Sequence, residues 1–165
     1  MADQFNANEV LTMAVQIERN GQEFYKKASE AVDDAQVSTL LADLATWESG
    51  HEIIFDSMRS DLNKEEMSST AIDPDNAASM YLKVMADDHV FKQQTGKPAD
   101  EMVSGRSTQE IIDLALKFEK DSLLFFLGLE RLVSPRLGKD RVYKVIDEEI
   151  SHINYLERQR SRLKG

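Results

Sequence analysis

Hydrophobic residues recur at steps of three and four along most of this chain, which is the spacing of amphipathic α-helices. A short acidic break at residues 32–34 separates the first two periodic segments, and a loop at 134–139 separates the last two. Each pair therefore predicts an antiparallel helical hairpin. The four predicted helices span about residues 8–31, 35–62, 107–133 and 138–163.

Residues 64–106, between the two hairpins, have the least regular pattern. They contain a turn region from Ser68 to Asp75, a short amphipathic stretch from about Asn76 to Gln93, and the sequence TGKP at 95–98. This predicts a long crossover with one short helix. Two hairpins joined in this way predict an all-α fold, a ferritin-like four-helix bundle forming one domain over residues 1–165. A bundle joined only by short loops fits the pattern less well.

The amino-acid composition excludes several classes of functional site. The chain has no Cys, which excludes disulfides, thiolate zinc sites, iron–sulfur clusters and cysteine nucleophiles. Its formal charge of −10 argues against nucleic-acid binding, because phosphate recognition depends on clustered Lys and Arg. No stretch approaches the roughly 18 apolar residues needed to cross a membrane, and the N-terminus is unlike a signal peptide. We therefore expect no membrane segment and a soluble cytoplasmic protein.

One or two positions on the apolar seam of each predicted helix hold residues unsuited to a core. Glu18 follows Leu11 by seven residues, and Glu119 follows Ile112 by seven, so both carboxylates should point inward. The second and fourth helices each carry a Glu-x-x-His pair on one face. The halves also repeat, with 30 residues between the two Glu positions of each half and an offset of 101. The inward-facing residues are Glu18, Glu48, His51, Glu119, Glu149 and His152.

Four buried carboxylates are untenable unless cations neutralise them or most of them protonate. Oxygen-rich ligation with one imidazole per metal favours iron or manganese over calcium, copper or a closed zinc site. A lone Glu-x-x-His is a weak signal, and a lone His on an apolar face is usually a hydrogen-bonded core residue. The joint pattern predicts a two-metal site, with two iron ions expected and manganese as the alternative.

Three other residues invite a functional interpretation. His89 lies in the crossover and is predicted to be a surface or structural residue. Tyr25 could be redox-active, but its counterpart in the repeat is Phe126, which favours a core aromatic. Trp47 directly precedes Glu48 and is expected to pack at the edge of the bundle.

The chain resembles the rubrerythrin-like branch of the ferritin-like superfamily in IERNGQEFY at 17–25, WESGHE at 47–52, FEKDSLLFF at 118–126 and EEISHI at 148–153. The resemblance implies a di-iron carboxylate site in a bundle that often dimerises, so we predict a homodimer. It also implies ligand roles. Glu48 and Glu149 would bridge the two irons, Glu18 and His51 would complete one, and Glu119 and His152 would complete the other.

Two departures qualify the resemblance. Rubrerythrins proper carry a further carboxylate one turn after the third-helix Glu, where this chain has Ser122. They also carry a cysteine-ligated rubredoxin iron, which a chain without Cys cannot hold. Peroxidase turnover would therefore need an external electron donor such as a partner redox protein.

These features predict an oxidoreductase that reduces hydrogen peroxide or dioxygen with electrons from ferrous iron or an external donor. Two alternatives remain open. The first is iron sequestration or delivery, which predicts uptake well beyond two irons per chain. The second is an interaction protein that keeps the metals only to stabilise its fold, which predicts metal binding without reaction with peroxide.

Overall fold

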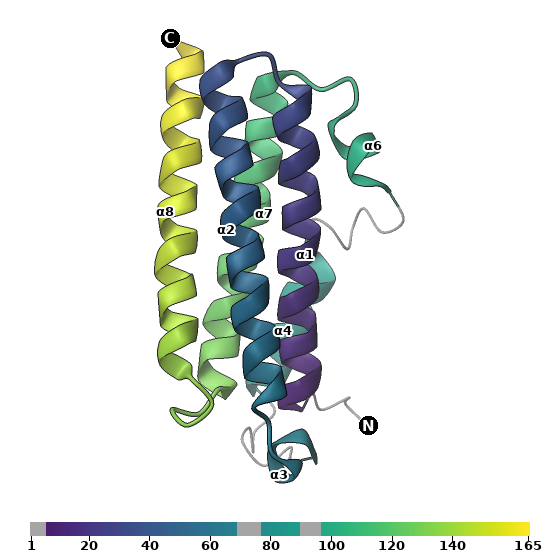
Figure 1. Ribbon diagram of the computed structural model, residues 1–165, viewed down its shortest axis with the longest axis vertical. Helices are drawn as coiled ribbons and strands as arrows, with labels where there is room; N and C mark the ends of the chain where they lie inside the picture. Colours follow the sequence, from purple (N-terminus) through teal and green to yellow (C-terminus); the bar gives the residue numbers. More distant parts are fainter. Residues whose placement is uncertain (1–5, 69–76, 90–96) are drawn as a thin grey trace.

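The computed structural model describes residues 6–68, 77–89 and 97–165, and these residues form helices and connecting segments without strands (Figure 1). The predicted all-α architecture is confirmed. The described helices include none that is long and apolar enough to span a membrane. The four long helices are α1 (Ala7–Ala31), α2 (Ala35–Ser60), α7 (Thr108–Leu132) and α8 (Lys139–Lys164).

Reciprocal capping fixes where α1 and α7 begin. The Asn6 side chain accepts the Glu9 N–H at 2.9 Å, and the Glu9 carboxylate accepts the Asn6 N–H at 2.9 Å. Ser107 and Glu110 make the same pair of bonds at 3.2 and 2.7 Å. These bonds satisfy N–H groups that have no partner within the helix. Ser107 therefore caps α7, whose first helical residue is Thr108.

The remaining helix ends lie within two residues of the predicted positions. α2 stops at Ser60, where the hydrophobic pattern had extended to residue 62. α8 begins at Lys139, one residue later than predicted, because Gly138 has a φ of 107°. Glycine adopts this left-handed conformation without steric cost, so the right-handed helix begins only at the next residue.

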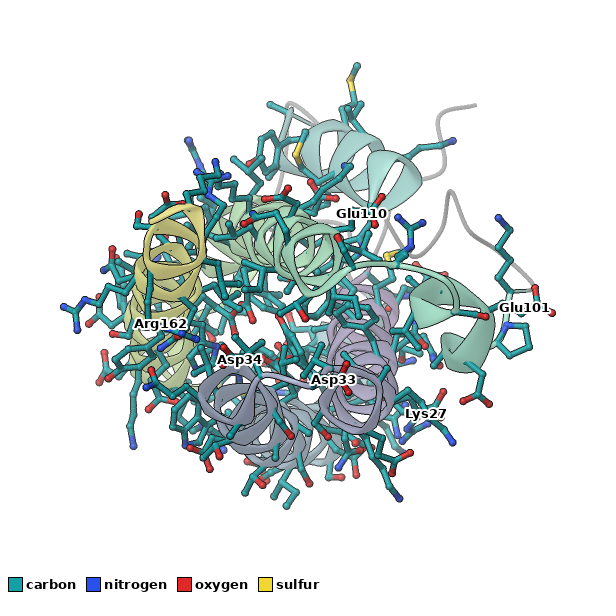
Figure 2. The ribbon with its side chains drawn as sticks, turned by 90° about the horizontal axis from the view of Figure 1, so that it is seen from above. Lys27, Asp33, Asp34, Glu101, Glu110 and Arg162 are labelled. Carbon is teal, nitrogen blue, oxygen red and sulfur yellow. The ribbon has the colours of Figure 1, made fainter. Side chains whose placement is uncertain are left out.

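The two hairpins, α1–α2 and α7–α8, pack against each other along their length (Figure 1). Large apolar side chains from the long helices fill the interior, including the fully buried Phe24, Phe55, Phe126 and Leu156. Burying each such side chain contributes about 1.5–3 kcal/mol. At one end of the bundle, Arg162 of α8 donates to Asp34 at the start of α2, at 2.7 Å (Figure 2). This contact joins the two hairpins.

The crossover contains more helix than the pattern predicted. The prediction of one short helix is wrong, because the described residues include α3 (Lys64–Ser68), α4 (Ala77–Asp88) and α6 (Ala99–Val103). α3 begins with an Asn63–Glu66 reciprocal cap that the periodicity did not reveal. α4 is the expected amphipathic helix with shorter bounds. Most of the predicted turn region, and residues 90–96, lie outside the described residues.

Two of the crossover helices cover the α1 and α7 side of the bundle, with α4 beside α7 and α6 beside α1 (Figure 2). Gly128 of α7 makes the α4 contact possible, because a Cβ there would lie 2.5 Å from the Tyr81 ring and 2.9 Å from Leu82. The Tyr81 hydroxyl also donates to the Leu124 carbonyl at 2.6 Å. Neither α4 nor α6 packs on the α2–α8 side to a comparable extent.

Candidate metal centre

The structure brings all six predicted residues together in the middle of the bundle. One comes from α1, two from α2, one from α7 and two from α8. Their ligating atoms form two groups, in each of which the atoms lie within 4.8 Å of one another. One group is Glu18, Glu48, His51 and Glu149, and the other is Glu48, Glu119, Glu149 and His152.

Both imidazoles turn Nδ1 toward the carboxylates. His51 Nδ1 lies 2.9 Å from Glu149 Oε1, 3.6 Å from Glu48 Oε2 and 3.7 Å from Glu18 Oε2. His152 Nδ1 lies 3.4 Å from Glu48 Oε1, 3.5 Å from Glu119 Oε2 and 3.8 Å from Glu149 Oε2. Each imidazole therefore faces three carboxylates, and Glu48 and Glu149 face both imidazoles.

The donor atoms of this cluster fit divalent metal ions. Among the described residues, nine buried side-chain N and O atoms lack a hydrogen-bond partner, and all nine belong to these six residues. A buried polar group without a partner costs about 1–3 kcal/mol, and a charged group costs more. Carboxylate oxygens and neutral imidazole nitrogens are ligands for iron and manganese. Bound cations would give these atoms the partners that the protein does not supply.

Without metal, the cluster must hold protons. Burial and the neighbouring Glu48 raise the pKa of Glu18 well above its usual range. Burial and the neighbouring Glu119 and Glu48 raise the pKa of Glu149 in the same way. Burial lowers the pKa of His152, but its contacts with Glu119 and Glu48 outweigh this and raise the pKa to about 9.

Metal binding should therefore release protons. Because a pKa of about 9 leaves His152 protonated near neutral pH, a metal that binds its Nδ1 must displace a proton. We expect proton release on binding and an affinity that rises with pH up to about 9, the pKa of His152. Calorimetric titrations in buffers of different ionisation enthalpy measure the number of protons released. Binding without proton release would contradict this protonation state.

Glu148 also belongs to the site, although the sequence analysis did not single it out. Its Oε2 lies 2.7 Å from His51 Nε2, the ring nitrogen that points away from the cluster. With Nδ1 free to bind a metal, Nε2–H donates to this carboxylate. Such outer carboxylates orient ligating histidines and raise their basicity. The only sequence feature that pointed to Glu148 was its position directly before Glu149 of the Glu-x-x-His motif.

Tyr25 and Trp47 both contact candidate ligands. Tyr25 is a fully buried core aromatic, as expected, and its hydroxyl donates to Glu119 Oε1 at 2.5 Å. Trp47 lies at the bundle edge, 37% exposed, and its ring stacks on His152 with centroids 5.1 Å apart and an interplanar angle of 12°. It therefore touches the site from the solvent side.

His89 is buried, which excludes the surface alternative. Only 3% of the residue is exposed, and its Nε2 lies 3.2 Å from the Ser122 hydroxyl. Its ring packs edge-on against Phe118. Burial lowers its pKa to about 4, so it is neutral near pH 7. Ser122, at the position of the further rubrerythrin carboxylate, is thus hydrogen-bonded to a neutral side chain from the crossover.

Comparison with known proteins identifies the family of this chain. The family model described as rubrerythrin matches residues 9–159. The chain belongs to the rubrerythrin family. The match covers all four long helices almost completely, together with every residue of the cluster. The resemblance found in the sequence is thereby confirmed.

One solved structure of another protein has the same fold as this rubrerythrin-family chain. It is that of a Thermotoga maritima protein provisionally named a ferritin-like diiron-carboxylate protein. The two chains share 23% sequence identity with a TM-score of 0.70, and the alignment covers 98% of each. The predicted ferritin-like bundle is therefore confirmed. A search of curated proteins found no match.

Proposed function

We propose that this protein is a di-iron carboxylate oxidoreductase that reduces hydrogen peroxide or dioxygen. The observation that carries the proposal is the set of nine unpaired, inward-facing donor atoms in two groups that share Glu48 and Glu149. Membership of the rubrerythrin family and the description of the Thermotoga maritima protein support iron as the metal. Manganese has the same preference for oxygen and imidazole ligands.

The ligand roles follow from the two groups. Glu18 and His51 would hold one metal, and Glu119 and His152 would hold the other. Glu48 and Glu149 have oxygens facing both positions and would bridge them. Bound iron supplies reversible one-electron chemistry toward the oxidant.

The protein's own residues prepare the site for this chemistry. The four carboxylates are fully buried, so bulk water is kept from the donor atoms. Glu148 accepts the outer N–H of His51 and fixes the tautomer whose Nδ1 faces the cluster. The Tyr25 hydroxyl donates a hydrogen bond to Glu119 Oε1. Burial and the nearby Glu119 carboxylate raise the pKa of Tyr25 well above its usual value. Tyr25 therefore keeps its proton inside the site.

Electrons would come from ferrous iron or from an external redox protein, because the chain has no Cys to hold a rubredoxin iron. We further propose a homodimer, as the resemblance implies. On the side between α2 and α8, which α4 and α6 contact little, the partly exposed Trp47 ring lies against His152, and we propose this side as the approach for an external donor.

The test is an anaerobic titration with ferrous iron followed by hydrogen peroxide, monitored by the near-ultraviolet absorbance of oxidised iron. We expect about two irons per chain and rapid oxidation. The double variant Glu48→Ala/Glu149→Ala should lose both. Asp43→Ala/Asp147→Ala is the matched control, because it removes two exposed carboxylates from the same two helices.

Each other outcome identifies a different function. Uptake far beyond two irons per chain would indicate iron storage or delivery. Binding of two irons that do not react with peroxide or dioxygen would indicate a metal-stabilised interaction protein. No iron binding by the wild-type chain would overturn both the ligand assignment and the proposed chemistry.

A further inference from the structure

The two halves of the site are related by the repeat, yet their surroundings differ. Adding 101 to the number of each ligand in the first half gives its counterpart in the second. The same offset relates two further pairs of residues beside the ligands, and in these pairs the chemistry is not preserved. The unlike pairs are Trp47 with Glu148, and Tyr25 with Phe126.

The first unlike pair supports the two histidines differently. Glu148 and Trp47 each directly precede the Glu of a Glu-x-x-His motif, and each contacts the histidine of the other half. Glu148 accepts the outer N–H of His51 at 2.7 Å. Trp47 stacks flat on the His152 ring. In the part of the chain that the structure describes, no protein group accepts a hydrogen bond from His152 Nε2, and this nitrogen is not among the nine buried atoms without a partner, so it reaches solvent.

This difference should change metal affinity. A carboxylate on the outer N–H of a ligating histidine orients the ring and makes the ligating nitrogen more basic, and its loss typically weakens metal binding 10–100-fold. A stacked indole holds the ring plane but cannot accept the N–H. The Glu148 side chain is 42% exposed, so water screens part of its effect, and we expect the lower end of that range, about 10-fold.

The second unlike pair acts in the same direction. The Tyr25 hydroxyl donates to Glu119 Oε1, so only Oε2 of that carboxylate lacks a partner. Phe126 has no hydroxyl to offer Glu18, and both Glu18 oxygens lack a partner. A hydrogen bond withdraws electron density from a carboxylate and occupies one of its lone pairs. Glu119 is therefore the weaker terminal ligand.

We propose that the two metal positions are unequal, and that the Glu18–His51 position binds a divalent cation at least about 10-fold more tightly than the Glu119–His152 position. The inference rests on the proposed two-metal function and deepens it. The Glu18–His51 position fills first and keeps its metal. The Glu119–His152 position fills second and empties first.

The test uses zinc as a diamagnetic probe and ¹⁵N-labelled histidine. The chain has only three histidines, so spectra of His51→Gln, His89→Gln and His152→Gln assign every ring nitrogen. We expect the first equivalent of zinc to shift His51 Nδ1 and the second to shift His152 Nδ1. Calorimetry should resolve two dissociation constants at least about 10-fold apart.

Exchanging the unlike residues tests the cause. Glu148→Gln should weaken the tighter step about 10-fold and leave the weaker step unchanged. Trp47→Glu supplies the missing carboxylate and should tighten the weaker step, whereas Trp47→Phe keeps an aromatic ring and should not. Tyr25→Phe frees Glu119 Oε1 and should also tighten the weaker step. Tyr25→Phe therefore tests the cause of the inequality if Trp47→Glu does not fold.

The outcomes separate this inference from the proposed function. If two zinc ions bind while both histidines shift in parallel, or His152 shifts first, the inequality is wrong and the two-metal function stands. If the steps separate but neither Glu148→Gln nor Tyr25→Phe changes them, the assigned cause is wrong. If neither histidine shifts and ferrous iron does not bind, both proposals are overturned.

Discussion

Loading both metal positions is expected to raise the melting temperature of the metal-free protein by roughly 15–30 °C. A ligand that binds only the folded state stabilises it by about 4 kcal/mol at a free concentration 1,000 times its dissociation constant. Two such positions give about 8 kcal/mol, and each kcal/mol corresponds to about 2–4 °C in a domain of this size. Calorimetric melting of chelated and manganese-loaded protein measures the shift.

This gain depends on the buried cluster and should disappear with it. Glu48→Ala/Glu149→Ala should melt at the same temperature with and without manganese, whereas Asp43→Ala/Asp147→Ala should keep the wild-type shift. Equal melting temperatures for chelated and loaded wild-type protein would show that the six residues do not form a metal site.

Glu149→Gln is expected to stabilise the metal-free protein by about 1–3 kcal/mol near pH 8 while removing most of the stabilisation by metal. The pKa of Glu149 is raised by burial and by Glu119 and Glu48. A carboxyl whose pKa is higher in the folded than in the unfolded state costs stability at every pH above its unfolded value. Glutamine keeps the shape of the side chain but carries no such cost. Urea denaturation of chelated and manganese-loaded protein measures both effects.

The pH dependence of this gain follows from the sign of the shift. The difference between Glu149→Gln and wild type should shrink as the pH falls through 4.5, the ordinary pKa of Glu, because below this pH the carboxyl is protonated in both states. Asp147→Asn, two residues earlier on the exposed face of α8, is the control and should change little. A metal-free Glu149→Gln protein that is less stable than wild type would mean that the carboxylates stabilise the bundle without metal.

These two expected effects would indicate a site that favours metal binding at the expense of metal-free stability. The carboxylates and imidazoles are held on long helices fixed by the core and by capping bonds, so they stay close together although their mutual burial is unfavourable. Binding energy is then not spent on collecting the ligands.

The crossover shows where sequence periodicity is insufficient. Helices α3 and α6 contain five residues each, which is too short for a 3.6-residue period to be distinguished from chance. The start of α3 depends on the Asn63–Glu66 cap, and the position of α6 depends on contacts with the bundle, such as Lys27 of α1 with Asp100 of α6 at 3.2 Å. His89 was similarly ambiguous, because its burial depends on how the crossover packs against Phe118 and Ser122.

The sequence by itself determined the four long helices, their pairing into two hairpins and the six inward-facing residues. Helical periodicity places residues three, four and seven apart on one face, so a Glu-x-x-His pair on an apolar seam must point toward the core. Only the tertiary structure decided which side chains from different helices touch. Contacts such as Glu148 with His51, Trp47 with His152 and Tyr25 with Glu119 depend on the relative rotation and height of packed helices. No single helix encodes these quantities.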